Sequence, residues 1–226
     1  MLTEPTPLHE VLLAWFAAHK ADLPWRRRRD TYAVWVSEIM LQQTQVATVI
    51  PYFERFMARF PTVHALAEAS LDDVLKVWEG LGYYSRARNL HRTAQLLVTA
   101  YGGQFPSDPH LLQKLPGIGR YTAGAIASLA FGVTTPVLDG NVIRVLTRLF
   151  DLAEDVTLSR TQRMLWDLAA KLLPADRASA WNEALMELGQ RICTAPTPRC
   201  QECPLVAHCR AFANGTQLTR PVRQPR

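Results

Sequence analysis

Cysteine is scarce in this chain and confined to one place. The 226 residues contain four cysteines, all between Cys193 and Cys209. A disulfide framework spreads its cysteines so that bridges close long loops, so a disulfide-stapled secreted domain is excluded. No apolar run approaches the roughly 18 residues that a membrane span needs. The first ten residues also lack the basic-then-apolar order of a secretory signal. These absences predict a cytoplasmic protein with no membrane partner.

Acidic residues are missing from the C-terminal end. None follows Glu202, whereas Arg220, Arg223 and Arg226 do, and Arg26–Arg29 is an unbroken basic run. The net charge is +5, from 25 Lys and Arg against 20 Asp and Glu. This distribution favours a polyanionic partner, but it also fits a solvated basic surface followed by a disordered tail.

A strand pattern is absent as well. No stretch alternates apolar and polar residues for long enough, whereas apolar residues recur throughout at helical spacing. Ser70 to Asp73 and Asp108-Pro109 have the composition of helix starts, and Gly80 and Gly82 end a helix. We predict an all-α protein with short connections and no internal repeat.

The four cysteines have the spacing C-x6-C-x2-C-x5-C. Four thiolates in so short a stretch can surround one centre, and soft sulfur ligands favour an iron–sulfur cluster or zinc. Only Cys200 and Cys203 form a CxxC pair, which makes zinc the less favoured of the two. Four reduced thiols without a ligand remain the structural alternative.

A tight turn, Leu115-Pro-Gly-Ile-Gly119, separates two predicted helices. The glycines permit positive φ, and the amides of Gly117, Gly119 and the following helix start can face a phosphate. This is the helix-hairpin-helix pattern, which contacts the DNA backbone without reading sequence. An ordinary turn is the alternative, but Asp139 follows Tyr121 by 18 residues, a spacing that favours the hairpin.

Together these features resemble the MutY-type adenine DNA glycosylases of the endonuclease III superfamily. The resemblance extends from about Leu23 to Phe212. The stretches that carry it are Trp35–Val46, Gly80–Leu90, Leu115–Gly124, Leu138–Val142 and Asn182–Gly189.

The resemblance implies a two-lobed helical fold. Residues 25–133 would form a six-helix barrel with the hairpin, residues 1–24 and 134–212 a cluster lobe, and residues 213–226 a tail or linker. Cys193, Cys200, Cys203 and Cys209 would bind a [4Fe–4S] cluster, and the hairpin a monovalent cation. The protein would act as a monomer on nucleoid DNA.

The implied activity is monofunctional hydrolysis of the N-glycosidic bond of adenine mispaired with 8-oxoguanine or guanine, after the base is flipped out of the duplex. Glu38 stands among apolar residues, where burial raises a carboxyl pKa, and by resemblance it protonates adenine N7. Asp139 is a helix N-cap by its position, and by resemblance it stabilises the sugar cation. Asn141 would support it, and Tyr121 replaces the lysine that forms a Schiff base in bifunctional relatives.

Further residues match family positions that contact the base or the duplex. The adenine-pocket set is Trp25, Arg26, Leu41 and Glu183. The DNA-binding set is Gln43, Thr44, Tyr83, Gly117, Gly119 and Arg120. Gln43 and Tyr83 would wedge into the duplex, and Thr44 would touch the opposite base. Each could instead be a packing or solvated residue.

Three other functions compete. A thymine–guanine mismatch glycosylase shares the hairpin, the cysteines, Asp139 and Tyr121, but thymine has no N7 for Glu38 to protonate. An endonuclease III-like lyase is disfavoured by Tyr121. A catalytically silent iron–sulfur DNA-binding or electron-transfer module is disfavoured by the Glu38/Asp139 pair. Full-length family members continue into a domain that reads 8-oxoguanine, so we expect either a catalytic-domain fragment or a naturally short homologue.

Overall fold

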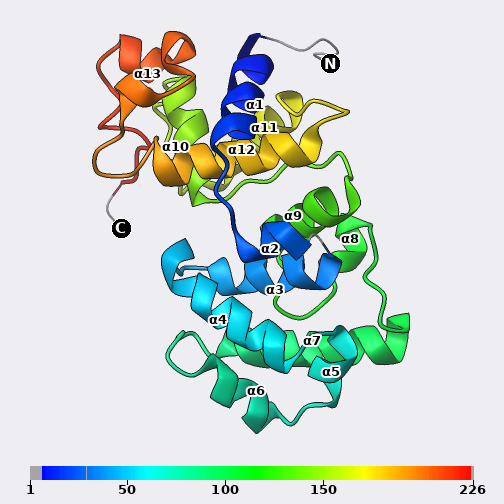
Figure 1. Cartoon of the computed structure of the whole chain (residues 1–226). Helices are drawn as coiled ribbons and strands as arrows, with labels where there is room; N and C mark the ends of the chain where they lie inside the picture. The colour runs from blue at the N-terminus through cyan, green and yellow to red at the C-terminus, as the bar shows by residue number, and fades with distance from the viewer. Residues whose placement is uncertain (1–6, 29, 225–226) are drawn as a thin grey trace. The chain divides into compact units, whose positions relative to one another are not determined.

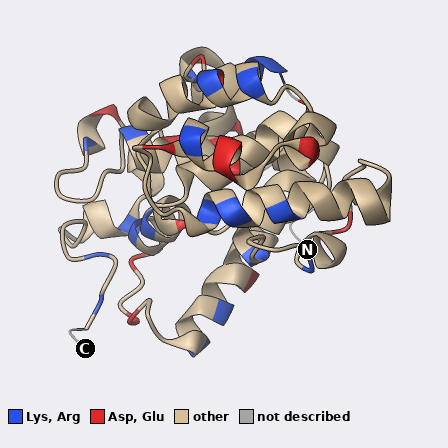
Figure 2. Ribbon diagram, turned by 90° about the horizontal axis from the view of Figure 1, so that it is seen from below, with Lys and Arg blue, Asp and Glu red and all other residues tan. Residues whose placement is uncertain are grey.

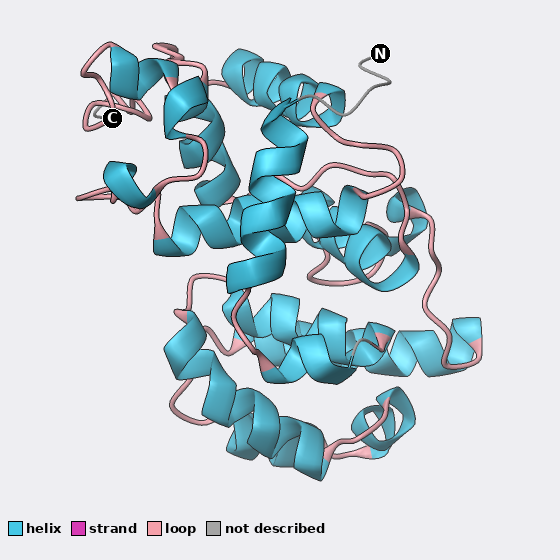
Figure 3. Ribbon diagram, turned by 45° about the horizontal axis from the view of Figure 1, so that its top comes forward, coloured by secondary structure: helices cyan, strands magenta, loops and turns pink. Residues whose placement is uncertain are grey.

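The computed structural model describes residues 7–28 and 30–224. Arg29 of the basic run and Arg226 of the tail lie outside this range. All regular elements in the described part are helical, and it contains no strand (Figure 3). The predicted all-α class is therefore confirmed.

The chain divides into two compact units (Figure 1). The central unit is Asp22–Phe131, and the terminal unit combines Met1–Ala21 with Gly132–Arg226. The central helices are α2 (Pro24–Arg28), α3 (Thr31–Leu41), α4 (Val46–Arg59), α5 (Val63–Glu68), α6 (Leu71–Trp78), α7 (Ser85–Tyr101), α8 (Pro109–Leu112) and α9 (Arg120–Phe131). The terminal helices are α1 (Pro7–His19), α10 (Gly140–Leu149), α11 (Ser159–Lys171), α12 (Ala178–Arg191) and α13 (Arg210–Ala213), with 3₁₀ turns at Cys200–Glu202 and Val206–His208.

Helix α3 is the core helix of the central unit. The Asp30 side chain caps it by accepting a 2.8 Å bond from the Ala33 amide, which satisfies one of the free donors of the first turn. All nine residues from Tyr32 to Met40 are buried, and the helix packs against α4, α7 and α9. A helix apolar on every side is stable only inside a core, so the burial of a carboxylate on it requires a specific explanation.

Local signals set the other helix ends. Ser70 accepts a 3.1 Å bond from the Asp73 amide, and Asp108 accepts a 2.7 Å bond from the His110 amide, as predicted for both helix starts. Gly80 and Gly82 follow α6 with φ of 91° and 77°, conformations that favour glycine. Pro51 lies inside α4.

Helix α12 is the centre of the terminal unit, with α1 and α10 packed against it. The crossing with α10 is close at Gly189, where a Cβ atom would lie 2.6 Å from Cβ of Asn141. Lys and Arg occur on many helices, with Asp and Glu among them (Figure 2). Over residues 7–28 and 30–224, no helix has both the length and the apolar character needed to cross a membrane.

Candidate active site and cysteine cluster

Glu38 and Tyr121 meet within the central unit. Glu38 is only 5% exposed on α3, although it is a carboxylate. Tyr121 comes from α9, which packs on α3, and its hydroxyl donates a 2.7 Å bond to Oε2 of Glu38. Buried carboxylates are rare unless they are paired or functional, so a buried carboxyl with an aromatic hydroxyl partner is a candidate acid–base group.

Gln43 and Tyr83, the two predicted wedge residues, share an unusual backbone. Their φ angles are 57° and 49°, in the left-handed region that disfavours residues with a Cβ. Both side chains are exposed, and Tyr83 exposes 59% of its surface. Thr44 follows, and its hydroxyl contacts the Gln42 carbonyl at 3.4 Å. Strained backbone with exposed side chains is typical of a ligand-contacting site.

The Leu115–Gly119 turn forms a tight connection between α8 and α9. Gly117 has φ of 76°, and a Cβ there would lie 2.8 Å from Cβ of Asn89. Gly119 does not have positive φ, and a Cβ there would meet nothing within 4 Å. Of these two glycines, only Gly117 therefore has the predicted positive φ. The open space at Gly119, beside exposed Arg120 at the start of α9, leaves room for a ligand.

The predicted adenine-pocket residues fall in different environments. Trp25 is 8% exposed and packs edge-to-face on Phe53, with ring centroids 5.4 Å apart. Arg26 and Leu41 are half-buried in the same unit. Glu183 is half-buried on α12 in the terminal unit.

Asp139 and Asn141 lie together at the start of α10. Asp139 Oδ1 accepts a 2.7 Å bond from the Val142 amide, so Asp139 is an N-cap as its position predicted. Asn141 Nδ2 donates a 2.7 Å bond to Oδ2 of the same carboxylate. Burial raises the pKa of Asp139 above its usual range, and the bonds from Val142 and Asn141 oppose this rise. A partly desolvated anion held by two donors can stabilise a nearby positive charge.

Arg144 connects this pair to the first cysteine, a role that sequence analysis missed. Its Nη2 donates to Oδ1 of Asn141 at 2.8 Å and to the Gly189 carbonyl at 2.7 Å. Its Nε donates to the Cys193 carbonyl at 2.6 Å. Asn141 and Arg144 are one helical turn apart, which is the only local signal of this contact.

The four cysteines are unbridged and line a single pocket, together with Arg148, Ile192, Pro198, Val206, Phe212 and Gln217. Arg148 Nη1 lies 3.3 Å from Sγ of Cys193 and donates to the Thr194 carbonyl at 2.7 Å. Burial raises the pKa of Cys203 to about 12 and also raises the pKa of Cys200 and Cys209. Within the described ranges, no group of three or more Cys, His, Asp or Glu side chains is arranged to hold a metal ion.

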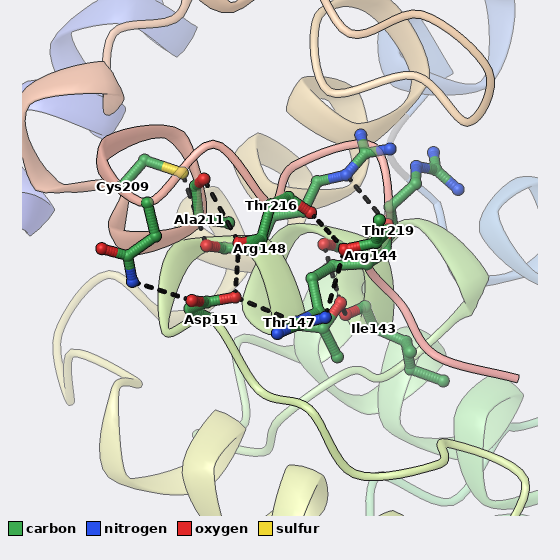
Figure 4. A network of polar contacts seen from close by, with 11 residues as sticks. Ile143, Arg144, Thr147, Arg148, Asp151, Cys209, Ala211, Thr216 and Thr219 are labelled. Carbon is green, nitrogen blue, oxygen red and sulfur yellow. Dashed lines mark hydrogen bonds and ion pairs between the residues drawn. The ribbon is translucent and has the colours of Figure 1, made fainter.

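The segment after α13, suggested above as a tail or linker, is hydrogen-bonded along α10 (Figure 4). Asp151 accepts bonds from Asn214 at 2.8 Å and from Thr216 at 2.7 Å, and it pairs with Arg220 at 2.9 Å. The Arg220 carbonyl in turn accepts from Nε of Arg148 at 3.1 Å. Residues past the last cysteine thus reach the cysteine pocket, where Gln217 is part of the lining.

Comparison with known proteins places this geometry in a family. The HhH-GPD profile of base excision DNA repair proteins matches residues 36–171. An adenine DNA glycosylase of Mycolicibacterium smegmatis is 43% identical over 94% of this chain and 73% of its own length. The chain belongs to the adenine DNA glycosylases of the HhH-GPD superfamily.

Two mammalian members of the family are also similar. The adenine DNA glycosylases of Rattus norvegicus and Homo sapiens are 50% and 49% identical over 93% of this chain. The chain spans only 42% and 40% of the length of these two proteins.

Solved structures agree with this fold. A thermostable thymine-DNA glycosylase has a TM-score of 0.82 and 27% identity, covering 91% of this chain and 94% of that one. A non-covalent endonuclease III–DNA complex has a TM-score of 0.77 and 26% identity, covering 92% and 94%. The latter is a structure with DNA bound, which accords with a DNA-binding fold.

Proposed function

We propose that this chain is a monofunctional DNA glycosylase that removes adenine mispaired with 8-oxoguanine or guanine. The observation that carries the proposal is the burial of Glu38 beside the Tyr121 hydroxyl. Breaking the bond between a purine and deoxyribose requires a proton on the leaving base and stabilisation of an oxocarbenium-like sugar. Family membership indicates that the excised base is adenine, because the relatives at 40–50% identity are named adenine DNA glycosylases.

Glu38 is the proposed proton donor to adenine N7. Its position on an apolar helix limits competition from water, and general acids work best in such sites. The Tyr121 hydroxyl donates to Oε2 of Glu38 at 2.7 Å. The bond also orients the carboxyl plane and stabilises the anion that remains after transfer.

Asp139 is the proposed partner of the sugar cation. Its two carboxylate oxygens are held by Val142 and Asn141, which fixes the direction of the negative charge. Preorganised charges of this kind cost little reorganisation when the transition state forms. Asn141 acts through Asp139 and is a positioning residue.

Tyr121 supports the monofunctional assignment. A Schiff base at C1′ requires a primary amine, and a phenol cannot form one. We therefore expect the product to be an abasic site in an intact strand.

The proposed partner is double-stranded DNA. Gly117, Gly119 and Arg120 would contact the backbone phosphates, since such contacts position a protein without reading sequence. Gln43 and Tyr83 would enter the base stack beside the flipped adenine. Their contacts would help to offset the stacking energy that is lost when the base leaves the duplex. Trp25, Arg26, Leu41 and Glu183 would line the adenine site, with Thr44 at the opposite base.

The residues fit a [4Fe–4S] cluster held by Cys193, Cys200, Cys203 and Cys209. Their four thiols line one pocket, and soft thiolate ligands favour an iron–sulfur cluster or zinc. The resemblance of the cysteine spacing to the cluster loop of the endonuclease III superfamily favours the cluster. When bound, the cluster would tie the C-terminal loop into one structure, because metal–thiolate bonds contribute directly to folding.

The test is a single-turnover assay on a duplex with one adenine opposite 8-oxoguanine. Duplexes with adenine opposite guanine and thymine opposite guanine are run in parallel, each with and without alkali. We expect strand breaks on the adenine duplexes, and only after alkali. Absence of adenine excision by protein that contains iron and sulfide would overturn the proposal, and excision of thymine would favour the activity named for the thymine-DNA glycosylase structure.

A further inference from the structure

Arg86 is buried between two loops of the central unit. It lies in the first turn of α7 and is 7% exposed. Five oxygens accept from its guanidinium, and all five are main-chain carbonyls. A buried cation is costly unless its donors are hydrogen-bonded. Nη1 and Nη2 have carbonyl acceptors, whereas Nε is buried without one, so the five carbonyl contacts are what hold the guanidinium in place.

The first set of carbonyls lies at the C-terminal end of helix α3. Nη1 of Arg86 donates to Ile39, Met40 and Gln42 at 3.2, 2.7 and 2.6 Å. The last carbonyls of a helix lack partners within the helix and carry partial negative charge. The guanidinium therefore caps α3, and its contacts stop one residue before Gln43.

The second set lies in the loop between α6 and α7. Nη2 donates to Leu81 and Gly82 at 3.3 and 3.2 Å, which stops one residue before Tyr83. The guanidinium carbon also lies 5.3 Å from the centre of the Tyr83 ring, within cation–π range. The Gly82 carbonyl is held additionally by Trp78 Nε1 at 3.0 Å.

Both residues that follow these carbonyls have strained backbones. Gln43 and Tyr83 have φ of 57° and 49°, and neither is a glycine. Such conformations persist only where surrounding contacts enforce them. One side chain, with one planar set of donors, provides those contacts to both loops.

We propose that Arg86 is a positioning residue that holds Gln43 and Tyr83 together in the geometry needed to enter the duplex beside the target base. The inference rests on the proposed function for the role of the two wedge residues. Lysine cannot replace Arg86. The planar guanidinium directs its two terminal nitrogens to two groups of carbonyls, whereas an ammonium is a single point donor.

The first test needs no substrate. Arg86→Met and Arg86→Lys are compared with Val63→Ala, a buried change on α5 in the same unit. Amide hydrogen exchange at residues 42–44 and 80–84 reports local opening. We expect exchange at both loops to rise at least tenfold in both Arg86 variants and to stay unchanged in Val63→Ala. Unchanged exchange at either loop would refute the proposal that Arg86 holds both loops. If Arg86→Met does not fold, Arg86→Lys alone is used for this comparison.

The second test measures coupling. Gln43→Ala is made in the wild type and in Arg86→Lys, and single-turnover excision of adenine is measured for all four proteins. If Arg86 acts through Gln43, then Gln43→Ala causes a smaller fold-loss in the Arg86→Lys background. Equal fold-losses in the two backgrounds would overturn the inference. A wild type that fails to excise adenine would defeat the proposed function alone, since hydrogen exchange still decides whether Arg86 holds both loops.

Discussion

The hydroxyl of Tyr121 lies 2.7 Å from Oε2 of Glu38, so a phenol on α9 orients a buried carboxyl on α3. Tyr121→Phe removes this bond without changing the ring. Hydrogen bonds to charged groups contribute about 1.5–3 kcal/mol, and about 1.4 kcal/mol corresponds to a tenfold rate change. We expect the single-turnover rate of adenine excision to fall roughly tenfold to a hundredfold.

Tyr32→Phe is the matched control for that variant. Tyr32 is a buried tyrosine of the same unit, and its hydroxyl donates to the Phe60 carbonyl at 2.8 Å. Its loss should lower the melting temperature and leave the excision rate within about twofold, given that only a structural bond is broken. If both variants lower the rate equally, the Tyr121–Glu38 bond has no special part in catalysis.

Asn141→Ala should move the acidic limb of the pH–rate profile. Burial raises the pKa of Asp139, and the Asn141 amide is one of the donors that lower it. The proposed role needs the ionised carboxylate, so activity falls as pH drops through this pKa, at a pH above the usual range near 3.9. Without Asn141 the pKa rises further, and the limb shifts to higher pH. A limb that stays in place would show that Asp139 does not control this titration.

Gly189→Ala should disturb the same pair through packing. The new Cβ would lie 2.6 Å from Cβ of Asn141 and 3.1 Å from its backbone, so α10 must move. Overpacking of this kind costs about 1–3 kcal/mol, and we expect a lower melting temperature together with slower excision. Gly119→Ala adds a Cβ in open space, so its melting temperature should match the wild type. Normal stability of Gly189→Ala would contradict the close helix crossing.

Asp151→Asn should loosen the C-terminal segment at neutral pH but not in acid. Hydrogen bonds from Asn214 and Thr216, and then the charge of Arg220, hold the pKa of Asp151 below its usual range. Because the pKa of Asp151 is lower in the folded state, its ionised carboxylate stabilises the fold at pH values above the unfolded-state pKa. This stabilisation is lost as the pH falls through the folded-state pKa. The melting temperatures of the variant and wild type should therefore differ at pH 7 and converge in acid, as the pH falls through the lowered pKa of Asp151.

Asp22→Asn is the control for this titration. Asp22 pairs with Arg27 on the exposed surface of the central unit, where an ion pair contributes little. Its melting temperature should follow the wild type at both pH values. A difference for Asp151→Asn that persists in acid would mean that its charge is not what holds the segment.

Features that depend on neighbours along the chain could be predicted from the amino-acid sequence. Helical spacing specified the all-α class, and Ser70, Asp108 and Asp139 are N-caps in the structure because a cap bonds within three residues. The cysteine spacing brings its four members to one pocket for the same reason, since a short loop cannot separate them widely. Glu38 could be singled out because a carboxylate on an apolar helix conflicts with its surroundings.

Contacts between distant segments could not be predicted from the sequence, because they depend on how the helices pack. Arg86 binds carbonyls 44 to 47 residues earlier, Arg144 reaches a carbonyl 49 residues later, and Asp151 holds Thr216 across 65 residues. The left-handed backbones of Gln43 and Tyr83 were equally unpredictable, because neither residue favours that conformation by itself. Periodicity and capping are local properties, whereas the partner of a long polar side chain depends on which helices pack together. The roles proposed for the arginines therefore follow from packing, and those of the caps and cysteines from sequence.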